Sequence, residues 1–357
     1  MKRTLVYELK RNLLPLVIFC AVAAAVSVVY TSTTTLSYTN EFGAYYEYSP
    51  IDSCLGAFEA VLCVLATIAP VMQFSYRMKQ RSADLWYSLP VGRKKLTLVR
   101  VLGGLVLVFA PYTLAYWLGV ACIALQETQF LFVHYLSFYA VSVVLGVGLF
   151  GVNCFLFTRA NTVEDGIVFL VLWACLLPLA VLVCLGNVRL ITIDVPEGTP
   201  EYLAHYRGMD IAAYLFPYSP TAAMSGLFEA LIFREEVSEA LLIPVWFAIP
   251  VCLLEGVGAY VGLFVRADRD RAENAGQVSS SWLGYRVLIP VYIVLLLGTV
   301  GDLLDGEILM GVLVAVIGAA LYFAYRRSFR VKKEDVICYA VSVALGIALA
   351  LILHYCT

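Results

Sequence analysis

The chain has little charge for its length, because only 14% of its 357 residues are charged while 62% are hydrophobic. A soluble chain of this size would carry roughly a quarter charged residues. Apolar runs of about twenty residues recur from end to end, and each is long enough to cross a ~30 Å hydrocarbon core. The composition therefore excludes an ordinary soluble protein and predicts an all-α, polytopic bundle of about eight to nine transmembrane helices.

The sequence also lacks the usual motifs of catalysis, metal binding and nucleotide binding. No Gly-Lys pair is present to close a phosphate-binding loop, and neither His-Glu-x-x-His nor Gly-x-Ser-x-Gly occurs. No two of the ten cysteines are spaced as Cys-x-x-Cys, and the three histidines are far apart. The basic residues are scattered over separate loops, which argues against a nucleic-acid partner. We therefore expect no catalytic residue, no metal and no cofactor on this chain.

Nine apolar runs are candidate spans. The seventh is short and interrupted by Pro290 and Gly298, so eight spans is the alternative. The candidate spans cover residues 13–30, 52–75, 101–125, 131–157, 166–186, 242–265, 286–301, 308–325 and 336–355.

Lysine and arginine are rare on one predicted side of the membrane. With the N-terminus inside, all but three of the 24 lysines and arginines lie in the leader or in inner loops. The exceptions are Arg189, Arg207 and Arg234. Because short cytoplasmic loops hold the excess of Lys and Arg, we expect a multi-pass chain with its N-terminus in the cytoplasm.

The predicted order of parts begins with an amphipathic leader, residues 1–12, which lies along the membrane interface or forms a solvated basic tail. A six-span core, residues 13–265, follows. It contains the inner loop 76–100 and an exterior segment, 187–241, with two Pro-marked helix starts at Thr199-Pro200 and Ser219-Pro220. Residues 266–357 would add a cytoplasmic loop and about three further spans.

The inner loop 76–100 is basic, bears aromatic residues and is too polar for lipid. We expect Ser82 to cap a short helix with Asp84 in its first turn, and Pro90 to stop it after about two turns. That helix would expose Leu85, Trp86 and Leu89 among charged residues. So short a helix is unstable alone in water, so we expect it to be held against a partner. The alternative is a basic loop that only fixes topology.

Two carboxylates and two glycine sets lie inside candidate spans. Glu255, near the middle of a span, and Glu59 are candidates for an intramembrane substrate or proton site, since an ionised group there costs roughly 2.5–3.5 kcal/mol on insertion scales. The alternative is a glutamate that ties helices together by hydrogen bonds. Gly146-x-Gly148-x-x-Gly151 and Gly258-x-x-x-Gly262 are interpreted as helix-packing sets.

The loop from Phe74 to Arg100 resembles the first cytoplasmic loop of bacterial ABC-transporter permeases of the type-2 exporter class, as found in Gram-positive bacteria. In that class a basic-Ser-Ala-Asp stretch leads into Ser-Leu-Pro, then a basic residue and Leu. The matching positions here are Arg81, Ser82, Ala83, Asp84, Ser88, Leu89, Pro90, Arg93 and Leu96. Arg271-Ala-Glu273-Asn-Ala275-Gly276 also resembles a motif of these permeases.

The resemblance implies that this loop is a coupling helix seated on a separate ABC ATPase subunit, which would bind the ATP and Mg²⁺. It also implies a second permease copy or a sister permease, a bacterial cytoplasmic membrane with its lipid, and export of a substrate. The three spans after the usual six depart from the family pattern.

Two other functions fit the same sequence. One is a secondary transporter driven by protons through Glu255. The other is a non-transporting membrane sensor or scaffold, which would still bind an ATPase but move no substrate.

Overall fold

The structure of the chain is a computed structural model. It describes residues 2–33, 37–39, 45–47, 50–88, 90–125, 132–184, 239–268, 272–279, 281–298, 308–328 and 332–356. The exterior segment expected at 187–241 lies outside the described residues up to Ser238, together with both Pro-marked helix starts.

Helices occupy all nine positions where the sequence predicts a span, which confirms the all-α fold. Seven of the helices are long and apolar enough to cross a membrane, whereas α11 and α12 carry shorter apolar stretches. The nine are α2 (Leu13–Thr33), α3 (Pro50–Phe74), α5 (Arg93–Ala124), α6 (Phe132–Phe157), α7 (Val163–Cys184), α10 (Glu239–Ala267), α11 (Tyr285–Gly298), α12 (Ile308–Arg326) and α13 (Lys333–Cys356).

Short elements flank these helices. The leader is the helix α1 (Lys2–Arg11), and a two-stranded antiparallel ribbon pairs β1 (Ser37–Thr39) with β2 (Tyr45–Glu47). The inner loop holds the 3₁₀ turn η1 (Ser75–Met78) and the helix α4 (Gln80–Tyr87), and a second 3₁₀ turn, η4, spans Ala272–Asn274.

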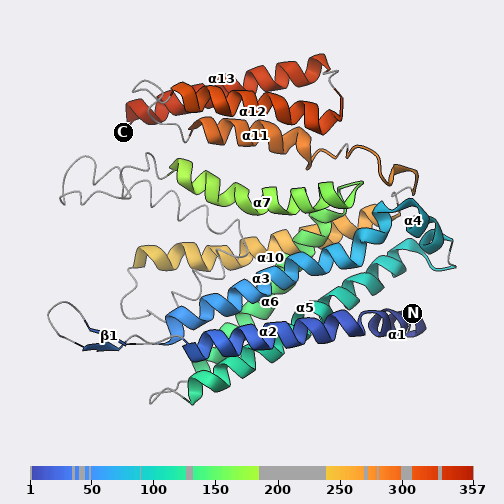
Figure 1. The fold of residues 1–357 in the computed structure, drawn as a ribbon, viewed down its shortest axis with the longest axis vertical. Helices are drawn as coiled ribbons and strands as arrows, with labels where there is room; N and C mark the ends of the chain where they lie inside the picture. Colours follow the sequence, from blue (N-terminus) through green and yellow to red (C-terminus); the bar gives the residue numbers. More distant parts are fainter. Residues whose placement is uncertain are drawn as a thin grey trace. The chain divides into compact units, whose positions relative to one another are not determined.

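The chain divides by packing into two compact units. Unit 1 comprises Met1–Phe157 and Pro217–Glu273, and unit 2 comprises Thr158–Phe216 and Asn274–Thr357. The fifth predicted span, α7, therefore groups with the three C-terminal helices (Figure 1). The functional division at residue 265, expected from the sequence, stays a prediction beside this division by packing.

Unit 1 is built around α5. Helices α1, α2 and α3 pack against α5, α3 also packs against α6, and α10 packs against α6. Small residues allow the closest of these approaches: a Cβ on Gly256 of α10 would lie 2.7 Å from the Cα of Gly148 of α6. The hydroxyl of Tyr260 adds a hydrogen bond to the Val147 carbonyl at 2.9 Å. The packing of α6 on α10 is thus backbone against backbone, as small residues permit in membranes.

The two predicted glycine sets have different outcomes. The α6 set is confirmed as a packing set, because Gly146 faces Leu62, Gly148 faces Gly256, and Gly151 faces the Tyr260 ring. In the α10 set, a Cβ on Gly262 would meet the Phe155 ring, but one on Gly258 would meet no atom of the described residues within 4 Å. The prediction for Gly258 is therefore wrong, and Gly256 makes the close contact instead.

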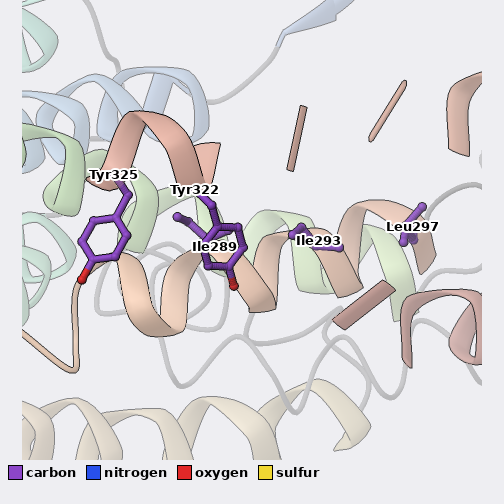
Figure 2. Packing of buried hydrophobic residues seen from close by; sticks show 5 residues of the cluster. All are labelled: Ile289, Ile293, Leu297, Tyr322 and Tyr325. Atoms are coloured by element: carbon purple, nitrogen blue, oxygen red, sulfur yellow. The ribbon is translucent and has the colours of Figure 1, made fainter. Parts of the chain in front are cut away.

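Unit 2 is organised around the short helix α11, which packs against α13, α12 and α7. Its core joins one face of α11 to two tyrosines of α12 (Figure 2). The residues of this core are Ile289, Ile293, Leu297, Tyr322 and Tyr325.

An ion pair joins the end of α12 to the first turn of α13. The Arg326 guanidinium donates two hydrogen bonds, both of 2.8 Å, to the two carboxylate oxygens of Asp335. This two-fold contact with the carboxylate raises the pKa of Arg326, so the arginine stays charged.

Candidate partner-docking site

The short helix predicted in the inner loop exists, but its start differs from the prediction. It is α4, eight residues from Gln80 to Tyr87, with Lys79 at its N-cap and no side-chain capping bond. Ser82 is therefore not the cap, and Asp84 is not in the first turn. The helix begins three residues earlier than predicted because the extended backbone of Lys79 follows directly on η1, and its carbonyl accepts the amides of Ser82 and Ala83.

One face of α4 is open to solvent. Arg81, Asp84, Leu85 and Ser88 are all exposed, and this i, i+3, i+4, i+7 spacing places them on a single face of the helix. Leu85 is the apolar centre of this face, with 64% of its surface exposed. We call these four residues the outward face of α4. Leu85 is thus an exposed apolar side chain flanked by charged and polar residues.

The opposite face of α4 is packed against the protein. Ala83 is fully buried, and Ser82, Trp86 and Tyr87 are partly buried. The sequence predicted Trp86 as an exposed contact, but its ring lies near the rings of Tyr76 and Tyr7, at centroid distances of 5.9 and 6.4 Å. Trp86 therefore anchors α4 to η1 and α1 rather than facing solvent.

A buried ion pair lies beneath Trp86. Arg100 of α5 and Glu8 of α1 are joined at 3.1 Å, and their side chains are 1% and 0% exposed. Arg11 contacts the same carboxylate oxygen at 3.0 Å. The Arg100 guanidinium also lies over two aromatic rings, 4.3 Å from the centre of Trp86 and 4.5 Å from that of Tyr76. Residues of α1, η1, α4 and α5 thus meet at one cation.

Two amide side chains extend this polar cluster into the bundle. Asn12 and Gln73 are buried, and both lie close to the Cα of Gly103, where a Cβ would be 3.6 and 3.9 Å from their amide atoms. Within the described part of the chain, the Asn12 Nδ2, both amide atoms of Gln73, and the Arg100 Nε and Nη2 have no hydrogen-bond partner. A buried polar atom that finds no partner costs roughly 1–3 kcal/mol, so these side chains are candidates for further hydrogen bonds within the cluster.

The leader is therefore more than a basic tail. Glu8 of α1 is buried against α5, while Val6, Tyr7 and Lys10 remain exposed. The leader forms the helix α1, whose most buried side chain is the carboxylate of Glu8, and its place at the membrane interface stays a prediction.

The residues after α4 tie the loop to α10. Arg93, one of the positions that match the resembled permease loop, is the first residue of α5, and it donates a hydrogen bond to the Asp268 carbonyl at 3.2 Å. Its guanidinium also lies 4.7 Å from the centre of the Tyr87 ring. Lys94 pairs with the Asp268 carboxylate at 3.0 Å. Pro90 is exposed in the turn before α5, and Leu89 lies outside the described residues.

The two intramembrane carboxylates are not brought together. Glu59 of α3 is partly buried, near Cys63 and Tyr112, whereas Glu255 of α10 is partly buried next to the close contact at Gly256. Among the ion pairs formed by described residues, none involves Glu255. The same residues contain no group of three His, Cys, Asp or Glu side chains that could hold a metal.

The Ala275-Gly276 motif has a structural role in unit 2. The Gly276 amide donates to the Asn161 carbonyl at 2.9 Å, with a positive φ of 80° that favours glycine. Nearby, Asp165 in the first turn of α7 accepts hydrogen bonds from the Ser279 and Tyr285 hydroxyls, at 2.7 and 2.9 Å. The segment after α10 is thus pinned to the start of α7.

Glu8, Asn12, Gln73 and Arg100 were not found by sequence reasoning. Each carries a weak signal: Glu8 is the only acidic residue of the leader, Gln73 interrupts an apolar run, and Arg100 directly precedes one. None of these signals identifies its partner.

The fold and these contacts define a multi-pass α-helical membrane protein with a short, anchored loop helix. Comparison of the chain with protein-family models, curated protein sequences and solved structures gave no match.

Proposed function

We propose that this chain is the membrane subunit of an ATP-binding-cassette transporter in a bacterial cytoplasmic membrane. The outward face of α4 would seat on a separate ATPase subunit, and a second copy of the chain or a sister permease would complete the complex. ATP binding and hydrolysis on the partner would then switch the helix bundle between its inward- and outward-open states.

The observation that supports this proposal most directly is the two-sided construction of α4. A helix of eight residues is too short to be stable alone in water. Here its inward face is fixed by Trp86 and Ala83, while its outward face presents Leu85 between Arg81 and Asp84. A helix held rigidly from behind and open in front can transmit force from a bound partner.

The test is affinity purification of the tagged chain from its native membranes, with mass spectrometry of the proteins that co-elute. A nucleotide-binding ATPase should be recovered with the wild type. Leu85→Asp should reduce that recovery by on the order of tenfold or more, as expected when a central apolar interface contact is replaced by a charge. Val6→Ala, an exposed apolar residue of α1, is the matched control and should leave recovery unchanged.

A second function is supported by Glu255, a carboxylate inside α10 with no ion-pair partner among the described residues. A proton-coupled secondary transporter would use it as the proton site. Failure to recover any ATPase with well-folded wild-type protein would favour this function, and Glu255→Gln should then abolish transport that needs no ATP. If an ATPase is recovered but vesicles containing the complex move no substrate, the chain is a sensor or scaffold.

A further inference from the structure

Trp86 joins α4 to the only buried ion pair formed between α1 and α5 in the described part of the chain. Its ring lies 4.3 Å from the Arg100 guanidinium and 5.6 Å from that of Arg11. Both arginines contact the Glu8 carboxylate. A displacement of α4 that moves the indole therefore changes the environment of both cations that hold Glu8.

Backbone hydrogen bonds connect the helical turn that contains Glu8 to the first span. The Asn12 amide donates to the Glu8 carbonyl at 3.0 Å, and the Leu16 amide donates to the Asn12 carbonyl at 2.9 Å. Backbone hydrogen bonds thus bridge the single-residue break between α1 and α2. Since α2 packs along α5, a shift of α1 reaches a membrane-spanning helix.

The same cluster contains the groups needed for a second arrangement. Arg100 has donors at Nε and Nη2, Gln73 has a donor and an acceptor, and Asn12 has a donor, and within the described chain these atoms have no hydrogen-bond partner. Buried groups in this condition favour rearrangements that pair them.

We propose that Trp86, Arg100 and Glu8 form a relay through which the position of α4 sets the position of α1 and α2. The relay rests on the proposed function, in which a partner docks on the outward face of α4. Its three members are positioning residues, and none of them belongs to the docking surface.

The first measurement uses the purified chain alone, by hydrogen–deuterium exchange of the amides of α1. Trp86→Leu keeps an apolar side chain but removes the ring face, and Arg100→Gln removes the cation. Both should speed exchange in α1 by at least about threefold, the loss expected for a partly buried cation–π contact. Trp86→Phe keeps a ring, so its exchange rate in α1 should fall between those of the wild type and Trp86→Leu. Leu85→Ala, on the outward face, should leave exchange in α1 unchanged.

Peptides from α6 serve as the folding reference, because α6 does not belong to the cluster. If α1 exchanges at the wild-type rate in Trp86→Leu while α6 is protected as usual, Trp86 does not hold α1 and the relay is refuted. If Trp86→Leu unfolds the chain, the exchange rates of α1 in Trp86→Phe and Leu85→Ala are compared instead. Equal rates in these two variants would refute the relay.

The second measurement adds the co-purified ATPase. Docking should alter exchange in α1 of the wild type, whereas Trp86→Leu should still bind the ATPase but lose that response. A full response in Trp86→Leu would overturn the relay while leaving the docking proposal intact. Recovery of no ATPase with the wild type would refute the proposed function and the relay's part in it, and the first measurement would still decide whether Trp86 holds α1.

Discussion

At the scale of single residues, the most consequential feature is a charged pair placed where neither member can be solvated. Glu8 and Arg100 are almost fully buried, so each depends on the other for its charge to be tolerated. Trp86 and Tyr76 shield the arginine further. The stability of the end of the bundle near α4 therefore depends on both charges being present together.

The first prediction follows from this dependence. Glu8→Leu should lower the free energy of unfolding by about 3–5 kcal/mol, because it leaves the buried Arg100 without a carboxylate. Arg100→Met should cost less, because Arg11 still contacts the Glu8 carboxylate. The double variant Glu8→Leu/Arg100→Met should be less destabilised than Glu8→Leu alone. Thermal unfolding in detergent, read as a double-mutant cycle, measures the coupling; additive losses would show that the two side chains do not act as a pair.

The second prediction concerns two glycines one half-turn apart on α10. Gly256→Ala should destabilise the chain by about 1–3 kcal/mol, because the new Cβ would strike the backbone of Gly148 and push α10 from α6. The Cβ of Gly258→Ala meets no atom of the part of the chain that the structure describes within 4 Å, so the substitution should change stability by less than about 1 kcal/mol. The melting temperatures of the two variants, measured side by side, check this; equal losses would contradict the packing of α6 on α10.

At the scale of elements, the segment after α10 is fixed by the first turn of α7. Asp165 is 8% exposed and accepts two hydroxyl hydrogen bonds, one from the loop and one from α11. Because α7, the loop and α11 meet at this carboxylate, its charge should stabilise the whole segment between α10 and α11.

The third prediction is that Asp165→Asn loosens this connection. The substitution removes the charge that strengthens both hydrogen bonds, so we expect a loss of about 1.5–3 kcal/mol of local stability. Hydrogen–deuterium exchange should rise in residues 274–284 and stay unchanged in α6. Glu164→Gln, an exposed neighbour on the same helix, is the control, and an equal rise there would point to a general charge effect instead.

Features of the fold and the site could be predicted where they depend on a local sequence pattern, and not where they depend on contacts between distant residues. The spans were predictable because apolar runs of membrane length are rare outside transmembrane helices, and α4 was predictable from its charges and from Pro90. Its start was not, because capping by Ser82 competed with an extended Lys79 that only the packing of η1 determines. The inward turn of Trp86 and the Glu8–Arg100 pair were not predictable either, since they depend on contacts between residues far apart in the chain.

At the scale of the whole molecule, the number of helices that cross the membrane decides on which side each terminus lies. The turn at Arg326 and Arg327 and the loop before α11 both contain arginines, which are typical of the cytoplasmic side. The 14 residues of α11 extend only about 21 Å, shorter than a ~30 Å hydrocarbon core, so the bilayer would have to thin locally for α11 to cross it. If all nine helices cross, an odd number of crossings separates the two termini.

The fourth prediction is that the N-terminus is cytoplasmic and the C-terminus exterior. Alkaline phosphatase fused after residue 357 should be active, because it folds only outside the cytoplasm, and a fusion at Ser328 should be inactive. Green fluorescent protein at the same two positions should give the opposite pattern. An inactive phosphatase at the C-terminus would show that α11 to α13 do not cross as an odd set.

The distance along the chain between Glu8 and Arg100 has a consequence for biosynthesis. Glu8 leaves the ribosome about 90 residues before its partner, which at 5–20 residues per second is roughly 5–20 s. During that interval the leader carries a carboxylate with no arginine from α5 to neutralise it, so α1 must wait in the aqueous interface beside the first two inserted spans. The leader can pack in its final position only after the third span, α5, has been inserted. Packing of the leader therefore depends on the spans being inserted in order.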